Sequence, residues 1–83
     1  MNRDTLQKKL CQLLKQVAPD SEPEKLQEND SIREVLGLDS FDALQFIVAL
    51  DEHLGVDIPE KDYNQTTSLA LLLVYLEKRL NQQ

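Results

Sequence analysis

The sequence has few of the residues on which catalytic and metal sites commonly depend. It contains one cysteine, one histidine and two glycines. A lone cysteine cannot form an internal disulfide, and one histidine with one cysteine cannot provide a zinc ligand set. The two isolated glycines exclude a glycine-rich phosphate loop. Residues 51–62 fail as a calcium loop, because Val56 stands where that loop requires glycine. We therefore expect no metal site.

Long apolar runs and targeting signals are also missing. No stretch approaches the ~18 apolar residues of a membrane-spanning helix. The N-terminal sequence MNRDTLQKKL lacks the apolar segment of a signal peptide. The composition, 41% hydrophobic and 29% charged, is that of a globular protein. These features predict a cytoplasmic protein without membrane insertion, and a length of 83 residues predicts one small domain over residues 1–83.

Basic residues are absent from the middle of the chain. No lysine or arginine occurs between Glu34 and Glu60. The acidic residues within that interval are Asp39, Asp42, Asp51, Glu52 and Asp57. The net charge of −6 argues against a nucleic-acid partner, because phosphates would be repelled. The acidic stretch is either a solvated surface or a face that steers a basic protein partner into docking.

Three stretches carry apolar residues at helical spacing. We expect helices over residues 4–17, 40–54 and about 67–80. Asp4 is the predicted N-cap of the first helix, which should end before Pro19. The predicted core-facing residues are Leu6, Leu10, Leu13, Leu14 and Val17, then Leu44, Ile47, Val48 and Leu54, then Leu69, Leu72, Leu73, Leu76 and Leu80.

The connecting segments are predicted to be mostly irregular. Residues 18–38 should form a long loop, in which Ser31 to Glu34 has the pattern of a capping box and allows one helical turn. The side chains expected to hold this loop on the core are Ile32, Val35, Leu36 and Leu38. Val56 to Pro59 should be extended, and Glu60 to Asn64 should form at most a short helix. The prediction is an all-α fold, a small four-helix bundle with three longer helices and one short helix.

Ser40 begins the second predicted helix. Asp39 is the expected N-cap there, and Asp42 adds negative charge at the positive end of the helix dipole. The only histidine, His53, follows Ser40 by thirteen residues, which along a helix is about 20 Å. Ser40 therefore lacks the base that a serine nucleophile needs, and we expect no enzyme activity. Its hydroxyl could instead bear a phosphate ester beside free backbone N–H groups, or Ser40 could be a small first-turn residue with no further role.

The stretch from Asp30 to Pro59 resembles the acyl carrier proteins. The residues that carry the resemblance are the turn Leu36-Gly37-Leu38-Asp39-Ser40-Phe41, the acidic helix after it, the segment Val56-Asp57-Ile58-Pro59 and, further on, Thr66-Thr67-Ser68-Leu69. By this resemblance Ser40 would bear 4′-phosphopantetheine, transferred from coenzyme A by a separate Mg²⁺-dependent phosphopantetheinyl transferase. The thiol of this arm would carry an acyl group as a thioester. The protein would then be a monomeric carrier and not an enzyme.

The resemblance also implies a docking face. Members of this family meet their partners mainly through the helix that follows the serine. Asp39, Asp42, Asp51 and Glu52 would therefore face basic patches on acyl-transferring or acyl-modifying enzymes. Phe41 would be an apolar contact at the same interface, and the alternative interpretation makes it an aromatic residue at the rim of the core.

Several cargoes and pathways fit the sequence. Fatty-acid, polyketide and related lipid biosynthesis are all compatible with the resemblance. Phe41 stands where leucine is more usual, and Gln45 stands where fatty-acid carriers commonly have an acid, so a specialised member fits as well as a housekeeping one. The alternatives are an aminoacyl carrier, D-alanyl or peptidyl, and an unmodified acidic helical adaptor that docks a basic protein surface.

Overall fold

Over residues 2–81, which the computed structural model describes, the chain forms four α-helices and two short 3₁₀ helices. The α-helices are α1 (Arg3–Val17), α2 (Ile32–Leu36), α3 (Ser40–Leu54) and α4 (Leu69–Asn81). The 3₁₀ helices are η1 (Pro23–Lys25) and η2 (Glu60–Gln65). These residues contain no strand, only an isolated bridge between Ser31 and Ser68. The predicted all-α fold, with three longer helices and one short α-helix, is confirmed.

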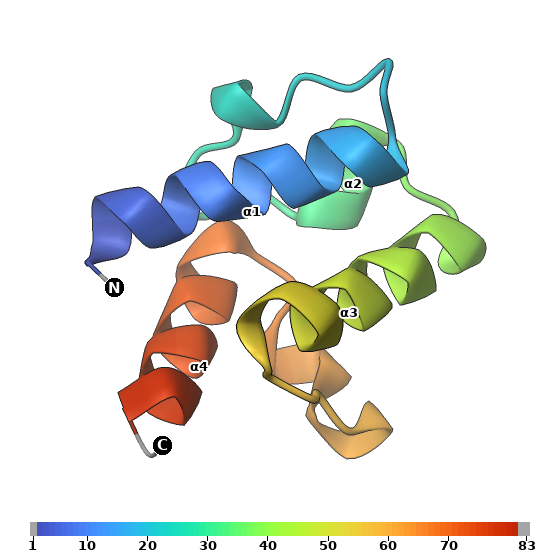
Figure 1. The fold of residues 1–83 in the computed structure, drawn as a ribbon. Helices are drawn as coiled ribbons and strands as arrows, with labels where there is room; N and C mark the ends of the chain where they lie inside the picture. Colours follow the sequence, from blue (N-terminus) through green and yellow to red (C-terminus); the bar gives the residue numbers. More distant parts are fainter. Residues whose placement is uncertain (1, 82–83) are drawn as a thin grey trace.

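Helix α1 lies across the other elements. In Figure 1 it crosses the upper half of the view, with α3 and α4 below it and α2 behind it. Arg3, at the start of α1, forms an ion pair with Glu77 of α4 and so ties the first helix to the last. Among the helices of residues 2–81, none combines the length and the apolar character that a membrane crossing requires.

The start of α1 differs from the prediction. Asn2, and not Asp4, is the N-cap, because the Asn2 side-chain oxygen accepts a hydrogen bond from the Thr5 N–H at 2.8 Å. The Asn2 backbone is extended, and its carbonyl accepts from the Leu6 N–H at 2.9 Å. Asp4 is thus a residue of the first turn, where its negative charge interacts favourably with the helix dipole.

The segment between α1 and α2 contains more structure than predicted. Helix η1 was not anticipated, and its first residue, Pro23, is buried against α1. Proline suits the first position of a helix, where its missing N–H would have no partner. The turn predicted at Ser31 is present as α2, and the Ser31 hydroxyl accepts from the Glu34 N–H at 3.4 Å.

Apolar side chains hold this segment on the core. Ile32 and Leu38 are buried as expected, and Leu36 is partly buried against the core. The prediction for Val35 is wrong, because its side chain is 51% exposed. In so short a helix, Ile32 and Leu36 share the inner face at a spacing of four residues, which leaves Val35 outside.

Helix α3 has the predicted bounds, but its core face is only partly the predicted one: Leu54 is buried and Ile47 packs partly buried against the core, as expected. Its buried residues are Phe46, Leu50 and Leu54, which recur every four residues along one side. Leu44 and Val48 were expected in the core, yet they are 50% and 44% exposed. The helix carries apolar residues on two faces, and the packing of α1 against the Phe46 face decides which of them is buried.

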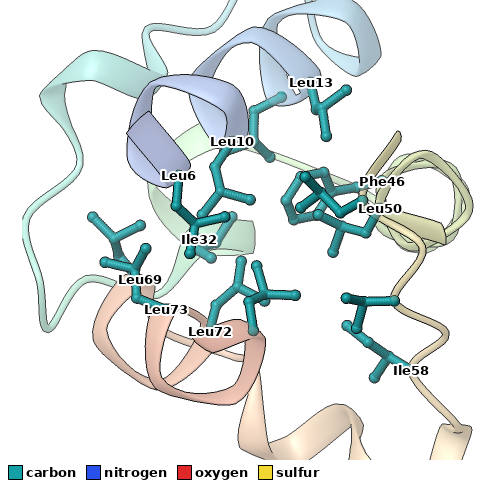
Figure 2. Packing of buried hydrophobic residues seen from close by; sticks show 14 of the residues in the cluster. Leu6, Leu10, Leu13, Ile32, Phe46, Leu50, Ile58, Leu69, Leu72 and Leu73 are labelled. Atoms are coloured by element: carbon teal, nitrogen blue, oxygen red, sulfur yellow. The ribbon is translucent and has the colours of Figure 1, made fainter. Parts of the chain in front are cut away.

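The core forms where the three long helices meet. Figure 2 shows side chains of α1, α3 and α4 directed toward one another, with Ile32 between those of α1 and α4 and Ile58 at the edge of the cluster. The buried hydrophobic residues are Leu6, Leu10, Leu13, Leu14, Leu26, Ile32, Leu38, Phe46, Leu50, Leu54, Val56, Ile58, Leu69, Leu72, Leu73 and Leu76. No polar or charged side chain among the described residues is buried, so hydrophobic burial is the main source of stability.

A small polar cluster fastens η2 to α4. The Tyr75 hydroxyl donates a hydrogen bond to Asp62 Oδ2 at 2.7 Å and accepts one from Arg79 Nη1 at 2.9 Å. Desolvation, together with the hydrogen bond to Asp62, raises the pKa of the Tyr75 phenol, so it remains a donor at neutral pH. The guanidinium of Arg79 also lies over the Tyr75 ring, 5.7 Å from its centroid.

Alanine substitutions on the two faces of α3 test which one is in the core. Leu50 is completely buried, whereas Leu44 is half exposed. Leu50→Ala should lower the free energy of unfolding by about 2–5 kcal/mol, because it leaves a cavity in a packed core. Leu44→Ala should lower it by less than about 0.5 kcal/mol. Urea unfolding followed by circular dichroism measures both losses, and equal losses would mean that Leu44 also packs in the core.

Candidate functional site

The turn between α2 and α3 is closed onto the backbone of Arg33. The Arg33 carbonyl accepts hydrogen bonds from the N–H of Gly37 and from that of Leu38, the latter at 2.9 Å. Gly37 has φ 67°, a left-handed conformation that strains any residue with a Cβ atom. Leu38 is buried, so the turn is held on the core as well as by its hydrogen bonds. The direction in which α3 begins is therefore set by this turn.

Asp39 caps α3 as predicted. Its Oδ1 accepts from the Asp42 N–H at 2.8 Å, and Asp42 Oδ2 accepts in return from the Asp39 N–H at 3.5 Å. The Asp39 carbonyl accepts from the Ala43 N–H. Within residues 2–81, the N–H groups of Ser40 and Phe41 have no acceptor, so two backbone donors remain available at the positive end of the helix.

Ser40 presents an exposed hydroxyl at this helix start. Its Oγ accepts a hydrogen bond from Arg33 Nη2 at 3.4 Å, and no carboxylate or imidazole of the described residues is bonded to it. His53 is exposed near the other end of the same helix. The chain therefore positions Ser40 without an internal base to activate it.

Arg33 was not anticipated as part of the site. The sequence offered one signal, since Arg33 is the only lysine or arginine between Lys25 and Lys61. The hydrogen bond between Arg33 and Ser40 depends on the turn at Gly37, which brings these two residues, seven positions apart, into contact. No periodicity predicts such a contact.

A cavity of about 450 Å³ extends from Ser40 between α2, α3 and η2. Its lining residues are Ser31, Ile32, Arg33, Leu38, Ser40, Ala43, Leu44, Phe46, Ile47, Leu50, Ile58, Tyr63, Asn64, Thr66, Thr67 and Leu72. The interior is mostly aliphatic and aromatic, and its volume is in the range of small-molecule sites. Ser40 and Arg33 belong to the polar part of this lining.

The outer face of α3 bears an exposed apolar stripe. Phe41, Leu44 and Val48 are 68%, 50% and 44% exposed and share one side of the helix. The interpretation of Phe41 as a core-rim residue is therefore wrong. Asp51 and Glu52 are also exposed, one turn beyond Val48. Leu44 and Val48 were predicted to lie in the core, so their place on this surface was not anticipated.

The remaining nucleophile, Cys11, lies outside this arrangement. Burial, with a smaller contribution from Glu24, raises the pKa of the Cys11 thiol, so the thiol is protonated and weakly nucleophilic at neutral pH. Cys11 does not line the cavity beside Ser40. Across residues 2–81, no three His, Cys, Asp or Glu side chains gather closely enough to hold a metal ion.

Comparison with known proteins points to one family. The sequence profile of the family described as "Phosphopantetheine attachment site" matches residues 4–81. The chain is 35% identical over 57 residues to an acyl carrier protein of Campylobacter curvus, a match that covers 69% of this chain and 74% of the relative.

Mitochondrial proteins are also similar to the chain. A putative mitochondrial acyl carrier protein of Schizosaccharomyces pombe is 28% identical over 76 residues, and a mitochondrial acyl carrier protein of Neurospora crassa is 26% identical over 76 residues. Each match covers 92% of this chain, but the chain spans only 68% and 57% of the length of these two relatives. The cytoplasmic location predicted from the sequence is not confirmed and stays a prediction.

Proposed function

Because the chain belongs to the phosphopantetheine-attachment family, that of the acyl carrier proteins, we propose that the Ser40 hydroxyl bears the 4′-phosphopantetheine arm. The observation that carries the proposal is the exposed Ser40 hydroxyl at the start of α3, beside two backbone N–H groups without an acceptor among the described residues. Such donors stabilise a phosphate ester.

The residues around Ser40 fit a phosphodiester. Arg33 contributes a guanidinium at hydrogen-bond distance from Oγ, and the helix dipole is positive at this end. Bound there, the arm would supply a flexible tether that ends in a thiol and carries the acyl group as a thioester. The chain itself would supply the anchor, the cavity and a docking face. Partner enzymes would supply the bases and metal ions, so we propose a monomeric carrier and not an enzyme.

The cavity beside Ser40 favours an aliphatic cargo. Its interior walls come from apolar side chains such as Phe46, Ile47, Leu50 and Leu72. Burying each CH₂ of an acyl chain there is worth about 0.8 kcal/mol, whereas burying the ammonium group of an aminoacyl cargo without a partner would be unfavourable. We therefore favour acyl intermediates of fatty-acid, polyketide or related lipid synthesis over D-alanyl or peptidyl cargo.

We propose that partners dock on the outer face of α3. The apolar stripe of Phe41, Leu44 and Val48 would be the centre of the contact, and the acidic residues would meet basic side chains at its edge. Asp51 and Glu52 are exposed without an ion pair among the described residues. Asp39 and Asp42 engage each other's backbone in the cap of α3, so their role in docking should be smaller.

Mass measurement tests the attachment. Incubation with coenzyme A, Mg²⁺ and a broad-specificity phosphopantetheinyl transferase should increase the intact mass by one phosphopantetheinyl group. Ser40→Ala should abolish the gain, because it removes the hydroxyl that we propose forms the ester. Ser31→Ala is the matched control, because it removes a nearby hydroxyl of the same cavity, and this variant should keep the gain in mass. A gain that persists in Ser40→Ala, or none in the unsubstituted protein, would refute the proposal.

Unfolding of loaded proteins tests the cargo. An octanoyl group on the arm should raise the free energy of unfolding by about 1–3 kcal/mol relative to an acetyl or D-alanyl group, because it buries several CH₂ groups. Ala43 lines the cavity, and Ala43→Leu should fill part of it and reduce this difference. Urea titration of each loaded form gives the values. Equal stability of the octanoyl and D-alanyl forms would contradict an aliphatic cargo.

Steady-state kinetics of the transferase, which is itself a partner, test the docking face. Asp51→Lys should raise the KM for the carrier several-fold at low salt and less at high salt, because salt screens contacts between exposed charges. Phe41→Ala should raise KM at both salt concentrations. Asp20→Lys makes the same charge change in the loop after α1 and serves as the control. If Asp20→Lys and Asp51→Lys have equal effects, the contribution is general charge and not a docking face.

A further inference from the structure

Arg33 is an isolated cation in an acidic part of the protein. It is the only lysine or arginine between Lys25 and Lys61. Its side chain is exposed, and among residues 2–81 it forms no ion pair. The one side-chain hydrogen bond that Arg33 forms with the described residues runs from Nη2 to Ser40 Oγ at 3.4 Å. A charged group directed at a neutral hydroxyl leaves most of its hydrogen-bonding capacity unused.

The backbone keeps Arg33 at this place. Its carbonyl accepts the N–H groups that close the turn at Gly37. The preceding residue, Ile32, is buried and donates its N–H to the Thr67 carbonyl at 3.0 Å, which ties α2 to the segment before α4. The guanidinium therefore extends toward Ser40 from an anchored segment.

We propose that Arg33 is the positioning residue for the phosphate of the arm, an inference that rests on attachment at Ser40. The ester oxygen of the arm would be Ser40 Oγ itself, the atom that Arg33 already contacts. A guanidinium presents a planar set of N–H donors that matches phosphate oxygens and remains charged at any physiological pH. It also offsets the repulsion between the phosphate and the carboxylates of Asp39 and Asp42, which flank Ser40 in the cap of α3.

Binding of the phosphate by Arg33 would determine where the arm lies on the protein. Arg33 and Ser40 line the same cavity, on its α2 side and its α3 side. A phosphate bound between them keeps the base of the arm over the opening of the cavity. Without Arg33 the two backbone donors of the α3 start remain, but no side chain on the α2 side directs the arm toward the cavity.

The test compares modified proteins by NMR and by thermal unfolding. The variants are Arg33→Gln, Arg33→Lys and, as a charge-matched control on α1, Lys8→Gln, each converted with coenzyme A and a phosphopantetheinyl transferase and verified by mass. Modification of the unsubstituted protein should shift the Arg33 Nε–H resonance. The ³¹P resonance of the arm should differ between this protein and Arg33→Gln, and the difference should shrink at high salt because the pair is exposed.

Thermal unfolding gives a second measure of the proposed contact between Arg33 and the phosphate. Modification should raise the melting temperature by about 2 °C more in the unsubstituted protein than in Arg33→Gln, as for an exposed ion pair. Arg33→Lys, a point charge without the planar donor set, should restore part of both effects, and Lys8→Gln should behave as the unsubstituted protein. Identical ³¹P resonances and melting shifts in fully modified Arg33→Gln would overturn the role of Arg33 and leave attachment at Ser40 intact. No mass gain in the unsubstituted protein would overturn both.

Discussion

The turn that joins α2 to α3 is the constraint on which the rest of the site depends. Two N–H groups of the turn converge on the Arg33 carbonyl, Gly37 takes the left-handed conformation and Leu38 enters the core. Together these fix where α3 begins, and with it the position of Ser40. A longer or looser connection would separate Ser40 from Arg33 and from the opening of the cavity.

The inner face, the outer face and the first turn of helix α3 have different roles. Its inner face, with Phe46 and Leu50, holds the helix against α1 (Figure 2). Its outer face leaves Phe41 and Val48 in solvent, where apolar surface is unfavourable unless another surface covers it. Its first turn presents the Ser40 hydroxyl and two backbone N–H groups that have no acceptor within residues 2–81. The carrier role that we propose would use all three of these surfaces.

Local signals were sufficient for much of the fold. The bounds of α3 follow from the Asp39 cap and from Gly55, which ends the helix in the left-handed conformation, and both features act within a few residues. The cap of α1 was assigned wrongly because Asn2 and Asp4 are both short polar residues ahead of the same apolar pattern. Which of them is extended is a property of the folded backbone. Helix η1 was missed because three residues are too few to produce a periodic pattern.

By itself the sequence determined the three long helices, the acidic character of the middle of the chain and the motif around Ser40, because each of these is encoded in neighbouring residues. The tertiary structure alone decided which of the two apolar faces of α3 is buried. Leu44 and Val48 are as hydrophobic as the residues that pack against α1, and only the position of α1 leaves them outside. It also decided that Arg33 meets Ser40 and that a cavity lies behind them, since both require segments that no local pattern relates to one another.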